Sequence, residues 1–260
     1  MLACLSTGCG TDDSAPDTAD VDASRASEVS AVGAAAHPLF EDGLERFSKG
    51  DFAGAIIQFR NVIQLEPTNP TARIEIGRAL NAAGDPASAE HELREAIRFE
   101  AHPNVVSEPL GVALLHQSKF ADLDRLVRDT GGRSPTVEAS MQLLLANAYV
   151  QQGDRQRALE ALDRARKLDP RNIEPLVKRA DIAFASGDND AAKEAIRIAE
   201  AIDPESAQVW AFKGRLSIRD GDYELALENY ERASALDRDL TSARAGYARA
   251  LVMLGRVEDA

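Results

Sequence analysis

Glycine recurs at a fixed interval through most of the chain. In steps of 34 residues from Gly50, with a single extra residue between Ser118 and Gly153, six of seven positions are glycine. These positions are Gly50, Gly84, Ser118, Gly153, Gly187, Gly221 and Gly255. Glycine accepts the left-handed backbone conformation that ends a helix, because it has no Cβ to clash. The chain is therefore constrained to repeat one short unit, in which a helix ends at the same position of every copy.

The unit is best preserved over residues 139–172. Its apolar residues recur at helical spacing on both sides of Gly153, so the pattern predicts two helices joined by a tight turn. Asp154 follows the glycine and is placed to cap the second helix by accepting from its first N–H groups. Pro170 cannot continue that helix and closes the unit. An Asp recurs after the glycine in other units, and we expect the same capping role at Asp51, Asp85, Asp188 and Asp222.

Two further positions of the unit are kept small. Position 8 is always glycine or alanine, and position 20 is alanine except at Leu123. A 34-residue helix–turn–helix period with this small-residue code resembles the tetratricopeptide repeat, or TPR. The resemblance covers roughly residues 36–260. It implies an all-α fold, an α-solenoid in which antiparallel helix pairs stack into a right-handed superhelix.

The period divides the array into about six full repeats and a truncated seventh. The expected units are 36–69, 70–103, 104–138, 139–172, 173–206, 207–240 and 241–260. The third unit, 104–138, is degenerate, because Ser118 replaces the turn glycine and Gly131-Gly132 should end its second helix early. The seventh stops at Ala260 before its second helix is complete, so we expect a labile last helix and a longer natural array.

The first nine residues resemble the end of a bacterial lipoprotein signal peptide. Cys9 is the expected lipid acceptor, because the small residue Gly8 precedes it. Two features depart from that pattern: Ser6 stands where Leu is usual, and a positively charged start is missing. The alternative is an N-terminus with two unused thiols, Cys4 and Cys9.

Residues 10–35 hold five Asp and one Glu against a single Arg, without helical or strand periodicity. Such a composition predicts a disordered acidic tether. A lipidated Cys9 followed by this tether implies a membrane-anchored protein. Gly10 after the cysteine implies the outer membrane of a Gram-negative bacterium.

Composition excludes several classes of function. The chain has 30 basic and 43 acidic residues, a formal net charge of −13, which argues against nucleic-acid binding. No phosphate loop, dinucleotide fingerprint, HExxH or GxSxG motif occurs. We therefore predict a non-catalytic protein with no cofactor, metal or small-molecule substrate. Trp210, at position 4 of its unit, is expected in the core, with a ligand platform as the alternative.

The remaining functional feature is the concave surface. In the TPR family the first helices line a groove that takes an extended peptide or a helix of another protein, and positions 2, 5, 9, 12 and 13 face it. The resemblance places these groove candidates: Arg78, Asn147, Arg215, Arg219 and Arg249. The last three could form a basic patch suited to a carboxylate or an anionic polymer. The alternative is that these arginines are paired with nearby acids.

The order of parts, a lipid-acceptor cysteine, an acidic tether and TPR units, resembles the TPR lipoproteins of bacterial exosortase (PEP-CTERM) systems. That resemblance implies a periplasmic scaffold that supports exopolysaccharide production and protein sorting, with other proteins or peptides as partners. Two alternatives stay open. One is a soluble, cytoplasmic TPR adaptor, and the other is the TPR helper region of a larger enzyme.

Overall fold

A computed structural model describes residues 32–129, 131–256 and 258 of the chain. Within these residues it contains helices and no strand, so the predicted all-α solenoid is confirmed. The helices are α2 (His37–Ser48), α3 (Phe52–Leu65), α4 (Pro70–Ala82), α5 (Pro86–Arg98), α6 (Pro103–His116), α7 (Phe120–Arg128), α8 (Pro135–Gln151), α9 (Arg155–Leu168), α10 (Glu174–Ala185), α11 (Asn189–Ile202), α12 (Ala207–Asp220), α13 (Tyr223–Leu236) and α14 (Thr241–Met253).

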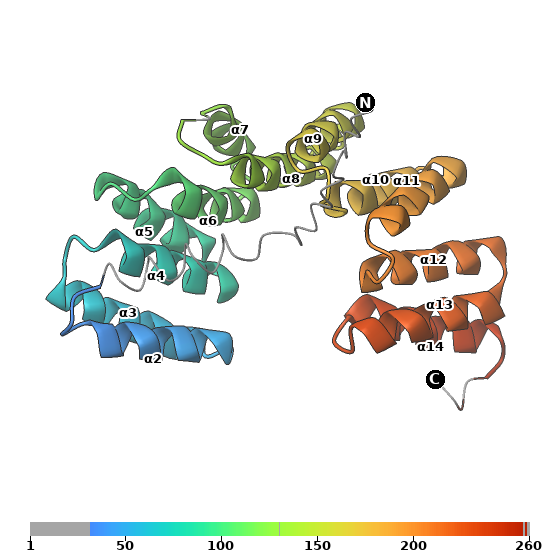
Figure 1. Cartoon of the computed structure of the whole chain (residues 1–260), viewed down its shortest axis with the longest axis horizontal. Coiled ribbons are helices and arrows are strands. Elements are labelled where there is room, and N and C mark those ends of the chain that lie inside the picture. The colour runs from blue at the N-terminus through green and yellow to red at the C-terminus, as the bar shows by residue number, and fades with distance from the viewer. Residues whose placement is uncertain (1–31, 130, 257, 259–260) are drawn as a thin grey trace, which may run out of the picture.

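The helices form an arch (Figure 1). Helices α2 and α3 make one foot, α7 to α9 lie at the crest, and α12 to α14 make the other foot. At the crest, α6 and α8 lie on the hollow side, with α7 and α9 outside them. First helices of neighbouring units contact one another in two groups, α4 with α6 and α6 with α8 in one, and α10 with α12 and α12 with α14 in the other.

The predicted turn conformation is confirmed at every recurring glycine. Their φ angles are all positive, from 75° at Gly153 to 88° at Gly221. Ser118 adopts the same conformation, with φ 56°, although it carries a Cβ. The turn around it is tied to α5, where Glu90 accepts from Gln117 Nε2 at 2.8 Å and from Lys119 Nζ at 2.6 Å. These contacts hold a backbone conformation that the residue type disfavours.

The small residues at position 8 lie under a large side chain of the second helix. A Cβ built on Gly77 would meet Leu93 Cγ at 2.5 Å, and one on Gly214 would meet the Tyr230 ring at 2.8 Å. Position 20 is equally crowded, since Ala55, Ala89, Ala158, Ala192 and Ala226 are fully buried. The close approach of the two helices therefore favours small residues at both positions, and Leu123 of the third unit is the exception.

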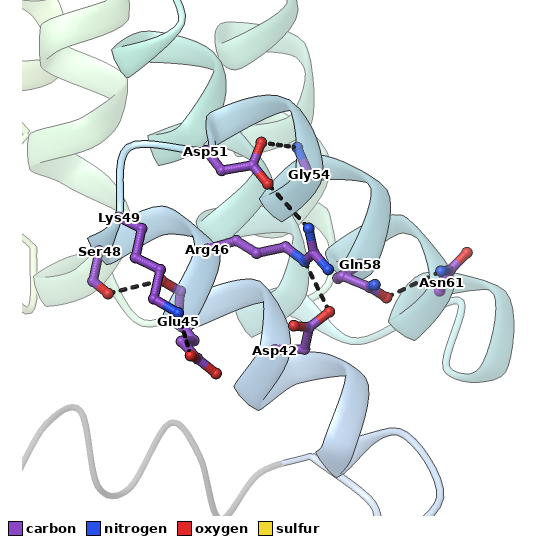
Figure 2. Close-up of polar contacts among 9 residues, drawn as sticks. All are labelled: Asp42, Glu45, Arg46, Ser48, Lys49, Asp51, Gly54, Gln58 and Asn61. Atoms are coloured by element: carbon purple, nitrogen blue, oxygen red, sulfur yellow. Dashed lines mark hydrogen bonds and ion pairs between the residues drawn. The ribbon is translucent and has the colours of Figure 1, made fainter.

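The acidic caps are confirmed at four of the five predicted positions. Asp51, Asp85, Asp154 and Asp188 each accept a backbone N–H of the following helix, at 2.9 to 3.1 Å. The prediction is wrong for Asp222, whose side chain makes no capping hydrogen bond. Figure 2 shows Asp51 receiving both the Gly54 N–H and Arg46, which also reaches Asp42 at 2.9 Å.

The third unit differs from the others as its sequence predicts. Its second helix, α7, spans only nine residues. Arg133 lies beyond the end of α7 with its side chain 2% exposed, and donates to the carbonyls of Leu126 and Val127 at 2.8 and 2.9 Å. Its Nε pairs with Glu138, the inserted residue, at 2.7 Å. A buried arginine thus satisfies carbonyls that a further helical turn would have used.

The first helix of the fourth unit begins before the position that the 34-residue period predicts. The period starts this unit at Ala139 and ends it at Asn172, whereas α8 begins at Pro135. Ser134 caps it by accepting from the Val137 N–H, and proline is favoured at the first helical position. The local Ser-Pro start signal therefore outweighs the 34-residue register.

Ser118→Gly should raise the free energy of unfolding by about 1 kcal/mol. A non-glycine residue in the left-handed region costs roughly 1–2 kcal/mol, part of which the greater freedom of glycine in the unfolded chain offsets. Urea unfolding followed by circular dichroism measures the change. The matched control is Gly153→Ala at the same position of the next unit, which should lower stability by a similar amount. An unchanged or lower stability for Ser118→Gly would contradict this account of the turn.

The caps also predict a pH dependence. The pKa values of Asp51 and Asp154 are lowered chiefly by the N–H groups of Gly54 and Arg157, and that of Asp85 by the Ser88 hydroxyl and then its N–H. Because the folded pKa lies below the unfolded one, the carboxylates stabilise the fold above about pH 4. That contribution is lost as the pH falls through the folded pKa.

Replacing all three residues with Asn keeps a cap acceptor and removes the titration. The variant should therefore show a flatter fall in unfolding free energy on acidification, measured by thermal melts across the acid range. Asp222→Asn is the control, because Asp222 makes no cap. An equally steep acid profile in the triple variant would mean that these caps do not control acid stability.

Candidate partner-binding groove

The concave face is formed by the first helix of each unit, and its second half carries a cluster of arginines on aromatic rings. Arg215 of α12 lies over the rings of Phe184 and Phe212, at 4.8 and 4.6 Å from their centroids. Arg219, one turn further along α12, lies 3.3 Å from the centroid of Phe184. The two rings are themselves packed edge to face, with 5.8 Å between their centroids. Stacking of this kind fixes the plane of a guanidinium group while leaving its N–H edge available.

Both arginines also have polar partners. Arg215 Nη1 pairs with Asp181 of α10 at 2.6 Å, and the two side chains are 41% and 47% exposed. Arg219 Nη1 donates to the Phe184 carbonyl at 2.7 Å and to Asn189 Oδ1 at 2.9 Å. The alternative interpretation, arginine paired with a nearby acid, therefore describes Arg215. An exposed pair of this kind contributes at most about 1 kcal/mol, so a competing carboxylate can replace Asp181 at small cost.

Arg249 of α14 lies near the same place. Tyr230 is buried between Gly214 of α12 and Gly246 of α14. Burial raises the pKa of the Tyr230 phenol, and the positive charges of Arg215 and Arg249 oppose that shift. Gly214 directly precedes Arg215, and Gly246 lies one helical turn before Arg249, so the contacts of both glycines with Tyr230 bring the backbones of the two arginines to the same side chain. The structure brings together three of the five predicted groove residues, Arg215, Arg219 and Arg249, which we call the arginine cluster.

The other two predicted groove residues lie elsewhere along the arch. Arg78 is on α4, paired with Glu75 at 2.5 Å. Asn147 is half-buried on α8 at the crest, and the structure brings neither residue to the arginine cluster.

Arg78 lies beside a pocket that the sequence did not single out. The pocket has a volume of about 470 Å³ and lies between α4 and α6; we call it the α4/α6 pocket. It is lined by Arg78, Asn81, Ala82, Asn104, Val105, Glu108, Pro109, Val112 and His116. A proline inside a helix, Pro109, was the signal that could have drawn attention to it.

Trp210 packs against the core residues of α12 to α14 but is only half-buried, so the expected core position is confirmed in part. It is half-buried between two cations, Lys213 Nζ at 3.8 Å and Arg232 at 4.7 Å from its ring centroid. Its Nε1 donates to the Pro204 carbonyl at 2.9 Å. The ring borders a second hollow, of about 600 Å³, lined by α11, α12 and α13. Aromatic–cation contacts are thus added to the apolar packing that position 4 predicts.

The described part of the chain shows neither a cluster of metal-ligating side chains nor a helix that could span a membrane. Over residues 32–129, 131–256 and 258, no three His, Cys, Asp or Glu side chains cluster as metal ligands. None of the described helices combines the length and apolarity needed to cross a membrane. The predicted lipidation site, Cys9, lies outside the described residues.

Solved structures with this architecture come from organisms as different as Pseudomonas aeruginosa and yeast. PilF of Pseudomonas aeruginosa is 16% identical, with a TM-score of 0.58, over 86% of this chain and 99% of its own. A tetratricopeptide repeat protein of Parabacteroides merdae is 14% identical, with a TM-score of 0.65, over 82% of this chain and 83% of its own. Yeast Tom70 is 18% identical, with a TM-score of 0.65, over 86% of this chain and 50% of its own. These likenesses concern the fold alone.

A comparison with curated proteins finds no match to this chain. A family model does match, that of the tetratricopeptide repeat, over residues 46–106, 149–216 and 217–260. Together these segments make up more than half of the sequence. The chain therefore belongs to the tetratricopeptide repeat family.

Proposed function

We propose that this protein is a non-catalytic scaffold that captures an acidic segment of a partner protein along its concave face. The observation that carries the proposal is the arginine cluster, in which two guanidinium groups are stacked on Phe184 and a third cation, Arg249, follows one helical turn after Gly246, which packs on Tyr230. The protein-binding role of TPR arrays gives the class of partner.

The stacking favours carboxylate recognition for a physical reason. An arginine held flat against a ring has already lost much of its side-chain freedom, so less entropy is lost when it binds. Its N–H groups can form charge-assisted hydrogen bonds with a carboxylate, each contributing about 1.5–3 kcal/mol. The net charge of −13 disfavours acidic partners elsewhere on the molecule, which concentrates their binding at this cluster.

We further propose that the scaffold is held at the periplasmic face of a bacterial membrane by a lipid on Cys9, and that it serves an exosortase-type sorting or exopolysaccharide system. The support is sequence alone: Gly8-Cys9 followed by the acidic stretch 10–35. A tether of that length reaches about 30 Å, enough to separate the array from a bilayer surface.

The groove is tested with Arg215→Gln combined with Arg219→Gln. Binding of a fluorescently labelled peptide of alternating Glu and Gly should weaken at least about tenfold, since two charge-assisted contacts are lost. Asp181→Asn is the matched control at the same site. It removes the competing carboxylate and should strengthen binding, while circular dichroism verifies that both variants fold. Equal affinity of the double variant and the parent protein would rule out the arginine cluster as the binding site.

The anchor is tested by expressing the complete gene in a Gram-negative host with labelled palmitate. Label should enter the protein and be lost in Cys9→Ser, whereas Cys4→Ser should keep it, because Cys9, with Gly8 before it and the acidic stretch after it, is the expected acceptor. Intact mass of the purified protein gives an independent readout. A mature protein that carries an unmodified Cys9 would refute the anchor without affecting the groove.

A further inference from the structure

We infer that the α4/α6 pocket binds a cationic side chain, lysine or arginine, from a segment lying in the groove. The inference rests on the proposed function, because it assigns a second contact point to the same concave face. Of the residues that line the pocket, Arg78, Val105, Glu108 and Val112 lie at positions 9, 2, 5 and 9 of their units. These are the positions that face the groove.

The pocket has hydrogen-bond acceptors that lack donors, and the first arises from Pro109. Proline has no N–H, so it cannot donate to the carbonyl four residues earlier in α6, that of Val105. Val105 and Pro109 both line the pocket, so the carbonyl that loses its helical donor belongs to a residue of the pocket. A helix interior is a costly place for proline, and here it leaves one backbone acceptor of this pocket without its helical donor.

The second acceptor is the amide oxygen of Asn81. Its Nδ2 donates to the Pro109 carbonyl at 2.9 Å, which joins α4 to α6 and fixes the orientation of the amide. The other end, Oδ1, is buried and has no hydrogen-bond partner among the described residues. Buried amide oxygens are normally paired, so an oxygen in this state beside a pocket indicates a missing donor.

The third acceptor is the carboxylate of Glu108, which is exposed at the pocket. The nearest cation, Arg78, is already engaged by Glu75, whose side chain is only 5% exposed. The charge available to a ligand is therefore negative, in a protein whose net charge is also −13. A carbonyl, an amide oxygen and a carboxylate together suit an ammonium or guanidinium group, which carries several donors and no acceptor.

The two ends of the groove then differ in charge preference. The α4/α6 pocket takes a basic side chain, and the arginine cluster takes carboxylates. A partner segment with a basic residue toward one end and acidic residues toward the other would bind in a single direction.

The test uses capped tripeptides and the full chain. Ac-Ala-Lys-Ala-NH₂ is compared with its norleucine counterpart, which keeps the four-carbon side chain and lacks the ammonium group, by ¹H–¹⁵N NMR titration. The lysine peptide should shift the Asn81 side-chain amide and the backbone signals of Val105 and Glu108, with an affinity at least tenfold above that of norleucine.

Two variants locate the site. Pro109→Ala restores the N–H and keeps the Pro109 carbonyl, so it should fold at least as well as the parent and bind the lysine peptide several-fold more weakly. Glu108→Gln should also weaken binding, whereas Glu41→Gln, at an exposed acid of α2, should not. Equal shifts with lysine and norleucine, shifts spread over other acidic surfaces, or unchanged lysine binding in both pocket variants would overturn the inference.

The acidic Glu-Gly peptide is titrated in the same samples. If it binds and depends on Arg215 while the lysine peptide does not bind, the pocket assignment is wrong and the proposed function stands. If lysine binds at the pocket but the acidic peptide does not bind at the arginine cluster, the carboxylate-binding groove fails and the cation site remains.

Discussion

The contact on which the structure depends is between position 8 of the first helix and position 24 of the second. Phe59, Leu93 and Tyr230 each press against a glycine that leaves no room for a Cβ. All six residues at position 24 are buried, from Phe59 at 0% to Val127 at 3% exposed. Because this contact sets how closely the two helices of a unit approach, it also sets where each first helix lies in the inner surface.

A regular spacing of first helices brings equivalent positions of neighbouring units together. Asp181 and Arg215, which pair across the groove face, are 34 residues apart and occupy the same position of consecutive units. Arg219 reaches the Phe184 carbonyl from almost the same separation. Side chains at the same position of consecutive units therefore lie side by side in the groove. A substitution at one such position alters a surface that two units share.

The sequence predicts well those features that depend on one residue and its immediate neighbours. The turn at Gly153 and the cap at Asp154 follow from backbone geometry, and so does the short α7 before Gly131-Gly132. It predicts poorly what depends on two distant segments. Position 4 predicts the apolar packing of Trp210 but not the contacts of Lys213 and Arg232 with its ring. The orphan oxygen of Asn81 depends on α6, and no spacing within α4 indicates it.

The buried Arg133–Glu138 pair has a consequence for how such an array can change in length. Units that touch only their neighbours can be duplicated or deleted in steps of 34 residues, since each new junction resembles the old one. The junction between the third and fourth units is different. Its arginine lies before the first helix of the fourth unit, and its glutamate lies in the first turn of that helix. Excision of either unit alone would leave one buried charge without its counterpart. Deleting or duplicating one of these two units alone is therefore costly, whereas the regular stretches on either side can change in steps of one unit.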